Sequence, residues 1–111
     1  MKLHFDEASA QIIAGKEHQY LVLDLDDGTG PFSKKLLENG LSYRLIFCHE
    51  KPDLSYFTHS IATNAGEIYF SEATKWYLDQ DMQVRFNPHY NVLQLFSEST
   101  LLEFDVKLVT V

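Results

Sequence analysis

The chain has 111 residues, the size of one domain, so we expect a single unit over residues 1–111. Hydrophobic residues make up 45% and charged residues 23%, an ordinary globular mixture that excludes a disordered or collagen-like chain. Nine Lys and Arg against 16 Asp and Glu give a net charge of −7, and an acidic chain without a basic stripe is a poor partner for nucleic acid or an anionic membrane.

The N-terminal part predicts a strand, a short helix and a second strand. Leu3 and Phe5 alternate with polar residues, which is the period of a strand. Asp6 is a typical helix N-cap, and Gly15 ends the helix that follows it. The run Tyr20–Leu25 alternates again and places three leucines on one face of a strand.

The rest of the chain predicts further short strands and a second helix. The run Leu41–Cys48 is apolar on both faces, which indicates a central strand. Ser71 is a second N-cap, and the spacing of Ala73, Trp76 and Tyr77 predicts a two-turn helix with these residues in the core. The other expected strands are Leu54–Ile61, Ile68–Phe70, Met82–Phe86, Val92–Phe96 and Phe104–Leu108.

These elements add up to about seven or eight short strands and two short helices. The strands follow one another through short turns, without the helical crossovers that usually join parallel strands. We therefore predict a mainly β (α+β) protein, an antiparallel β-sandwich or pseudo-barrel with two short helices at its ends.

The most unusual segment is a candidate binding loop at the end of the first long strand. Asp24 and Asp26 point to the same side of that strand, so they repel unless a divalent cation, an Arg or Lys, or water lies between them. An Asp/Gly turn whose carboxylates cap backbone N–H groups is the preferred alternative to a metal or ligand loop. The candidate binding loop comprises Asp24, Asp26, Asp27, Gly28, Thr29, Gly30 and Phe32.

Two further features bear on chemistry and compartment. Phe32 follows Pro31 and either faces a partner or folds back over the core. Cys48 and His49 are neighbours on a strand and point to opposite faces, so we expect a buried structural thiol rather than a nucleophile, and we assign no catalytic or metal residues. A single cysteine excludes an internal disulfide, and no segment has the apolar length of a signal peptide or membrane span, which favours a cytoplasmic protein.

Five segments, taken in order, resemble the HesB-like domain of A-type iron–sulphur cluster carriers. More closely, the chain is similar to a short, cysteine-poor branch from Gram-positive bacteria that is labelled with iron–sulphur cluster biosynthesis. The resemblance implies a small β-rich pseudo-barrel with an N-terminal helix. The segments are FDEASAQII, LDLDDGTGPFS, SYRLIF, GEIYFSEATKWYLDQDMQVRFNP and VLQLFSES.

The cysteines depart from the pattern of these carriers, which hold a cluster or iron with one thiol in a glycine-rich loop and a Cys-Gly-Cys near the C-terminus. The loop corresponds to residues 27–30 here and has no thiol, and the segment Phe96–Val111 contains no cysteine. Cys48 matches neither position. The resemblance therefore implies the fold and the family but no cluster ligands.

Three functions remain open at this point. The first is a non-enzymatic HesB-like binding or accessory protein whose loop meets a protein partner, a small ligand or a hard divalent cation such as Mg²⁺, Ca²⁺ or Mn²⁺. The second is an iron or iron–sulphur carrier that binds metal through Cys48 between subunits. The third is a small enzyme that uses the carboxylates as acid and base. Edge strands of a small β domain often find partners, so a homo-oligomer is compatible with each.

Overall fold

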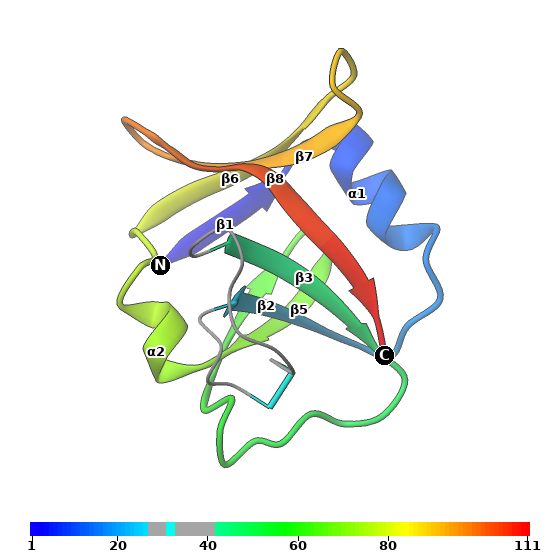
Figure 1. Cartoon of the computed structure of the whole chain (residues 1–111), viewed down its shortest axis with the longest axis vertical. Coiled ribbons are helices and arrows are strands. Elements are labelled where there is room, and N and C mark those ends of the chain that lie inside the picture. The colour runs from blue at the N-terminus through cyan, green and yellow to red at the C-terminus, as the bar shows by residue number, and fades with distance from the viewer. Residues whose placement is uncertain (27–30, 33–41) are drawn as a thin grey trace.

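The computed structural model describes residues 1–26, 31–32 and 42–111. In this part of the chain, eight strands form one sheet that curls into a nearly closed barrel, with two short helices on opposite sides of it (Figure 1). The elements are β1 Lys2–Phe5, α1 Glu7–Ala14, β2 Tyr20–Asp26, β3 Ser42–Cys48, β4 His59–Thr63, β5 Gly66–Phe70, α2 Glu72–Lys75, β6 Asp81–Asn87, β7 Val92–Ser97 and β8 Leu101–Thr110.

The predicted mainly β architecture with two short helices is confirmed, and the sheet is mixed. Its strand order is β1-β6-β7-β8-β3-β2-β5-β4. The pairs β2–β3, β4–β5, β6–β7 and β7–β8 are antiparallel, whereas β1–β6, β2–β5 and β3–β8 are parallel. The parallel partners are joined through other strands, so they need no helical crossover between them.

A side chain closes the seam between the two ends of the sheet. Asn64 lies in the turn between β4 and β5, and its amide makes both hydrogen bonds that a neighbouring strand would make to Phe5 of β1. The Phe5 N–H donates to Asn64 Oδ1 at 2.9 Å, and Asn64 Nδ2 donates to the Phe5 carbonyl at 2.7 Å. The turn ends at Gly66, whose φ of +110° favours glycine.

The core lies inside the barrel and follows the predicted alternation. Leu21, Leu23 and Leu25 of β2 are all buried on the inner face, as expected. β3 is buried on both faces along its second half and lies between β2 and β8, which confirms its prediction as a central strand. Ile13 of α1 enters the same core.

The cap of α1 also ties this helix to the sheet. Asp6 Oδ1 accepts the Ser9 N–H at 2.8 Å, as predicted for an N-cap, and Asp6 Oδ2 accepts the Phe86 N–H at 3.1 Å. Partial burial works against the ionised carboxylate, but the hydrogen bonds from Ser9 and Phe86 outweigh it, so the pKa of Asp6 lies below its ordinary value of 3.8.

The second helix is shorter than predicted, and its expected apolar face is wrong. Ser71 caps α2 as predicted, since its hydroxyl accepts the Thr74 N–H at 3.1 Å. The buried side chain of α2 is Thr74, whose hydroxyl accepts the Leu25 N–H at 3.2 Å. Trp76 is 80% exposed and Tyr77 is also exposed. A four-residue helix has no second turn to bury, and neither described helix has the length and apolar character to cross a membrane.

The segment before β4 also differs from the prediction of a strand over Leu54–Ile61. Residues 54–56 form a turn, and β4 begins only at His59. The backbone carbonyl of Asp53 accepts the N–H groups of Tyr56 and Phe57 at 3.1 and 2.9 Å, which closes the turn. Alternation alone did not reveal this local hydrogen bonding.

We expect Asn64→Ala to lower the free energy of unfolding by about 1–3 kcal/mol, because it leaves a buried backbone N–H and C=O of Phe5 without their seam partners. Urea denaturation measures this loss. The matched control is Ser60→Ala, at an exposed position on β4 of the same hairpin. Equal stability of the two variants would contradict the closure of the barrel at Asn64.

We expect Asp6→Ala to destabilise the protein by about 1–2 kcal/mol at pH 7, the usual cost of a lost N-cap. Because the folded-state pKa of Asp6 is lowered, its contribution is present above about pH 4 and is lost as the pH falls through the folded pKa. Urea midpoints of wild type and variant should therefore converge at acid pH. Asp81→Ala, at an exposed carboxylate of β6, should show no such convergence.

Candidate functional site

The outer face of β2, β3 and β8 carries a row of charges. Asp24, Arg44 and Lys107 stand opposite one another on three adjacent strands. Arg44 Nε and Nη2 donate to Asp24 Oδ2 at 2.9 and 2.8 Å, and Arg44 Nη1 lies 3.4 Å from Asp26 Oδ2. One guanidinium therefore bridges the two aspartates that share this face of β2.

This geometry places an arginine between Asp24 and Asp26, which is one of the three predicted ways of relieving their repulsion. The side chains of Asp24 and Arg44 are only 3% and 12% exposed, so the pair lies largely out of water, and Asp26 is 29% exposed. An arginine, rather than water, holds the two carboxylates together.

The structure describes only part of the remainder of the candidate binding loop. Asp27, Gly28, Thr29 and Gly30 lie outside the described residues, so a divalent cation at this loop stays a prediction. Within the ranges that the structure describes, no group of three or more His, Cys, Asp or Glu side chains could hold a metal ion. Phe32 is described, and it folds back onto a second apolar cluster.

That second cluster occupies the same outer face beyond the charged row. Val22 and Ile46 are fully buried and stand opposite each other on β2 and β3, and Val109 of β8 continues the row. Phe57 covers them, and Phe32 stacks on Phe57 with 5.5 Å between the ring centroids. Of the two alternatives for Phe32, the packed one is confirmed.

The turn at residues 53–57 places Phe57 over this cluster. Asp53 Oδ1 accepts both the N–H and the hydroxyl of Ser55, at 3.0 and 2.5 Å. These bonds lower the pKa of Asp53, the side-chain bond from Ser55 most. Phe57 is 1% exposed as a result, although it belongs to no strand or helix.

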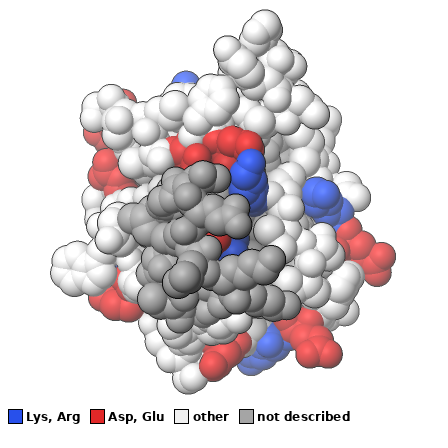
Figure 2. All heavy atoms as spheres, viewed as in Figure 1, with Lys and Arg blue, Asp and Glu red and all other residues white. Residues whose placement is uncertain are grey.

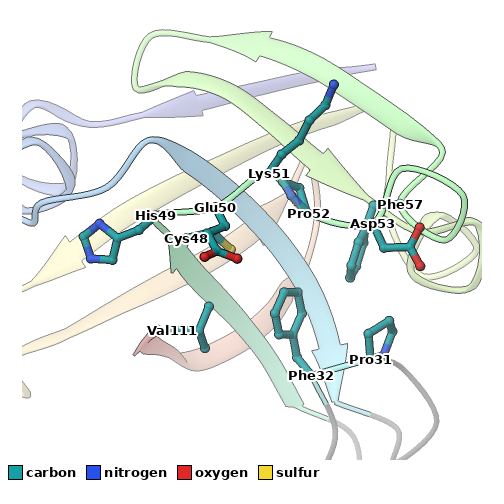
Figure 3. Close-up of a pocket in the computed structure, with 10 residues that line it drawn as sticks. All are labelled: Pro31, Phe32, Cys48, His49, Glu50, Lys51, Pro52, Asp53, Phe57 and Val111. Carbon is teal, nitrogen blue, oxygen red and sulfur yellow. The ribbon is translucent and has the colours of Figure 1, made fainter.

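A pocket of about 550 Å³ opens beside the Phe32–Phe57 pair (Figure 3). Its wall on the other side is the end of β3 and the segment that follows it. The described residues that line it are Pro31, Phe32, Cys48, His49, Glu50, Lys51, Pro52, Asp53, Phe57 and Val111. The sequence patterns indicate no site at residues 49–53 and miss this pocket; Pro52, an apolar residue that the structure buries, was the available signal.

Cys48 lies in the wall of this pocket as a structural thiol, which confirms its prediction. It is 3% exposed, and its sulphur lies 4.0 Å from the carbonyl oxygen of Ile46. Burial raises the pKa of the Cys48 thiol above its ordinary value of 9.0, so the thiol is protonated at neutral pH. The imidazole of His49, in the bend directly after β3, points away from it (Figure 3).

The charges on the visible face around this region are mixed. Figure 2 shows acidic and basic side chains interspersed, without a basic stripe. The row of paired charges and the neighbouring apolar pocket both lie on the described part of the outer face.

The small mixed β-barrel with an N-terminal helix defines the structural class, and the comparisons supply the family. The chain belongs to the iron–sulphur cluster biosynthesis family, whose model matches residues 1–110. This finding confirms the resemblance to HesB-like proteins. No curated protein sequence matches the chain.

Two solved structures share the fold. A candidate Fe-S biosynthesis protein from Lactobacillus salivarius superposes with a TM-score of 0.84 at 22% identity, over 99% of this chain and 98% of that one. A second candidate Fe-S biosynthesis protein, from Lactobacillus acidophilus, gives a TM-score of 0.76 at 25% identity, over 99% and 90% of the two chains.

We expect Arg44→Met to lower the free energy of unfolding by on the order of 3 kcal/mol, because it removes the charge partner of the buried Asp24 and keeps the aliphatic stem. Urea denaturation measures the loss. Adding Asp24→Asn should restore part of it. The matched control is Lys107→Met, which faces Arg44 from β8 and pairs with Asp105 in solvent; it should cost less than about 1 kcal/mol. Similar losses in both single variants would contradict a buried pair.

Proposed function

We propose that this protein is a non-enzymatic binding or accessory protein of iron–sulphur cluster biosynthesis, which acts without ligating a cluster or iron itself. The observation that carries the proposal is the state of its single cysteine. Clusters are held by several thiolates, whereas Cys48 is one thiol, buried and with a raised pKa. This donor set does not fit an iron–sulphur cluster.

The carboxylates of the outer face support the same proposal. Asp24 and Asp26 are engaged by Arg44, and carboxylates are hard ligands that replace thiolates poorly in iron–sulphur sites. The same ion pairs argue against the two aspartates as an acid and a base, because the Arg44 guanidinium already contacts a carboxylate oxygen of each.

The binding role rests on the shape and charge of the outer face. A pocket with aromatic walls lies next to a fixed row of charges, and such concave apolar sites with a few polar groups are typical of ligand binding. The net charge of −7 favours a protein or small-molecule partner over nucleic acid or an anionic membrane. We assign the protein to the cytoplasm, where a reduced thiol such as Cys48 is the normal state.

The second candidate, a carrier that binds metal through Cys48 between subunits, requires this thiol to reach the surface and lose its proton. Cys48 packs in the cluster with Val22, Ile46 and Phe57 and is 3% exposed. A shared site would therefore need this cluster to open in each subunit, a step that the accessory role does not require.

Anaerobic reconstitution with iron and sulphide separates the two candidates. We expect a protein without visible thiolate-to-iron absorbance after desalting, and we expect Cys48→Ser to give the same spectrum. A chromophore that survives desalting in the wild type and disappears in Cys48→Ser would overturn the proposed function and establish the carrier. Ser99→Ala, at an exposed position after β7, controls for nonspecific effects of substitution.

A further inference from the structure

We infer that the pocket between the Phe32–Phe57 pair and the end of β3 is a binding site for a small organic amine with an apolar ring or chain. The inference rests on the proposed function in one respect, that the protein acts by binding. It adds the chemical class of the ligand, which neither the family nor the related structures assign.

The size and walls of the pocket fit a small apolar group. Its volume of about 550 Å³ lies within the range of ligand sites, roughly 300–1,000 Å³. The two phenylalanine rings are stacked 28° from parallel, and Tyr56 supports Phe57 from its edge at 4.9 Å between centroids. The apolar wall comprises Pro31, Phe32, Cys48, Pro52, Phe57 and Val111.

The polar groups at the pocket select the charge of the ligand. In Figure 3 the carboxylate of Glu50 lies on the pocket side, whereas the side chains of His49 and Lys51 point away. The carboxylate of Asp53 is turned to Ser55 at the rim. Among the described residues, the charged group that faces the pocket is therefore a carboxylate, and aromatic ring faces also attract cations.

A metal ion fits this pocket less well than an ammonium group. The Cys48 thiol is protonated at neutral pH, and Glu50 has no partner carboxylate or imidazole in the described part of the pocket with which to form a three-ligand set. An ammonium needs only a carboxylate and an apolar surface for the rest of the molecule. Glu50 and the Phe32–Phe57 pair provide both.

The probe for this inference is 2-phenylethylamine, with 3-phenylpropionate as the matched anion of similar length. We expect the amine to give saturable chemical shift changes in amide NMR spectra in the millimolar range, and the anion to bind at least about fivefold more weakly. The affected amides should be Phe32, Cys48, Glu50, Lys51, Phe57 and Val111.

Two variants test the two halves of the site. Glu50→Gln should weaken the amine about fivefold and leave the anion unchanged or tighter, since it removes the carboxylate. Phe32→Ala should weaken both probes, because it removes a wall. Glu98→Gln, at an exposed glutamate after β7, should leave both affinities unchanged.

Equal binding of the two probes, shift changes that map away from the pocket, or amine binding that Glu50→Gln leaves intact would each overturn the inference. Its failure differs from failure of the proposed function. A colourless protein that ignores the amine loses the ligand assignment alone, whereas a cysteine-dependent chromophore overturns the accessory role even where the amine binds.

Discussion

The pairing of Arg44 with Asp24 is the interaction on which the outer face of the sheet depends. Two aspartates alternate on one face of β2, and the antiparallel register sets Arg44 directly opposite the more buried one, with its third nitrogen, Nη1, near Asp26. Because one guanidinium lies between the two carboxylates, their mutual repulsion is reduced within the sheet itself. A buried ion pair of this kind contributes to register more than to stability, since any shift by one residue would bury a carboxylate without its guanidinium.

The same register divides the outer face into a charged end and an apolar end. The charged row Asp24–Arg44–Lys107 is followed, two residues along each strand, by the row Val22–Ile46–Val109. The apolar row is covered by Phe57 and Phe32, which come from irregular segments far apart in the chain. The pocket lies where this cover meets the end of β3, so its existence follows from strand register and from a local turn at Asp53. Among the described residues, Glu50 turns its carboxylate to the pocket side.

The sequence predicts those parts of the structure that local rules govern. Alternation identifies the leucine face of β2, the two-sided burial of β3 and the caps at Asp6 and Ser71. It indicates that a divalent cation, an Arg or Lys, or water must relieve the repulsion between Asp24 and Asp26, but not which of these, because only the pairing of two strands brings Arg44 there. The helical spacing of the sequence predicts a buried Trp76, which is wrong because α2 ends at Lys75, before Trp76. The parallel pairs and the pocket depend on contacts between distant segments. A periodic pattern in the sequence carries no information about such contacts.

The division between the two faces of the sheet explains how the family fold can persist with a changed chemistry. The inner face holds the large core, and its residues alternate with those of the outer face on the same strands. Substitutions on the outer face therefore change charge, donors and pocket walls while they leave the barrel packing in place. A donor set as poor in thiolates as this one is compatible with membership of the iron–sulphur cluster biosynthesis family, because the barrel needs none of the cluster ligands to fold. In the described residues, the outer face then carries a paired charge row and an apolar pocket.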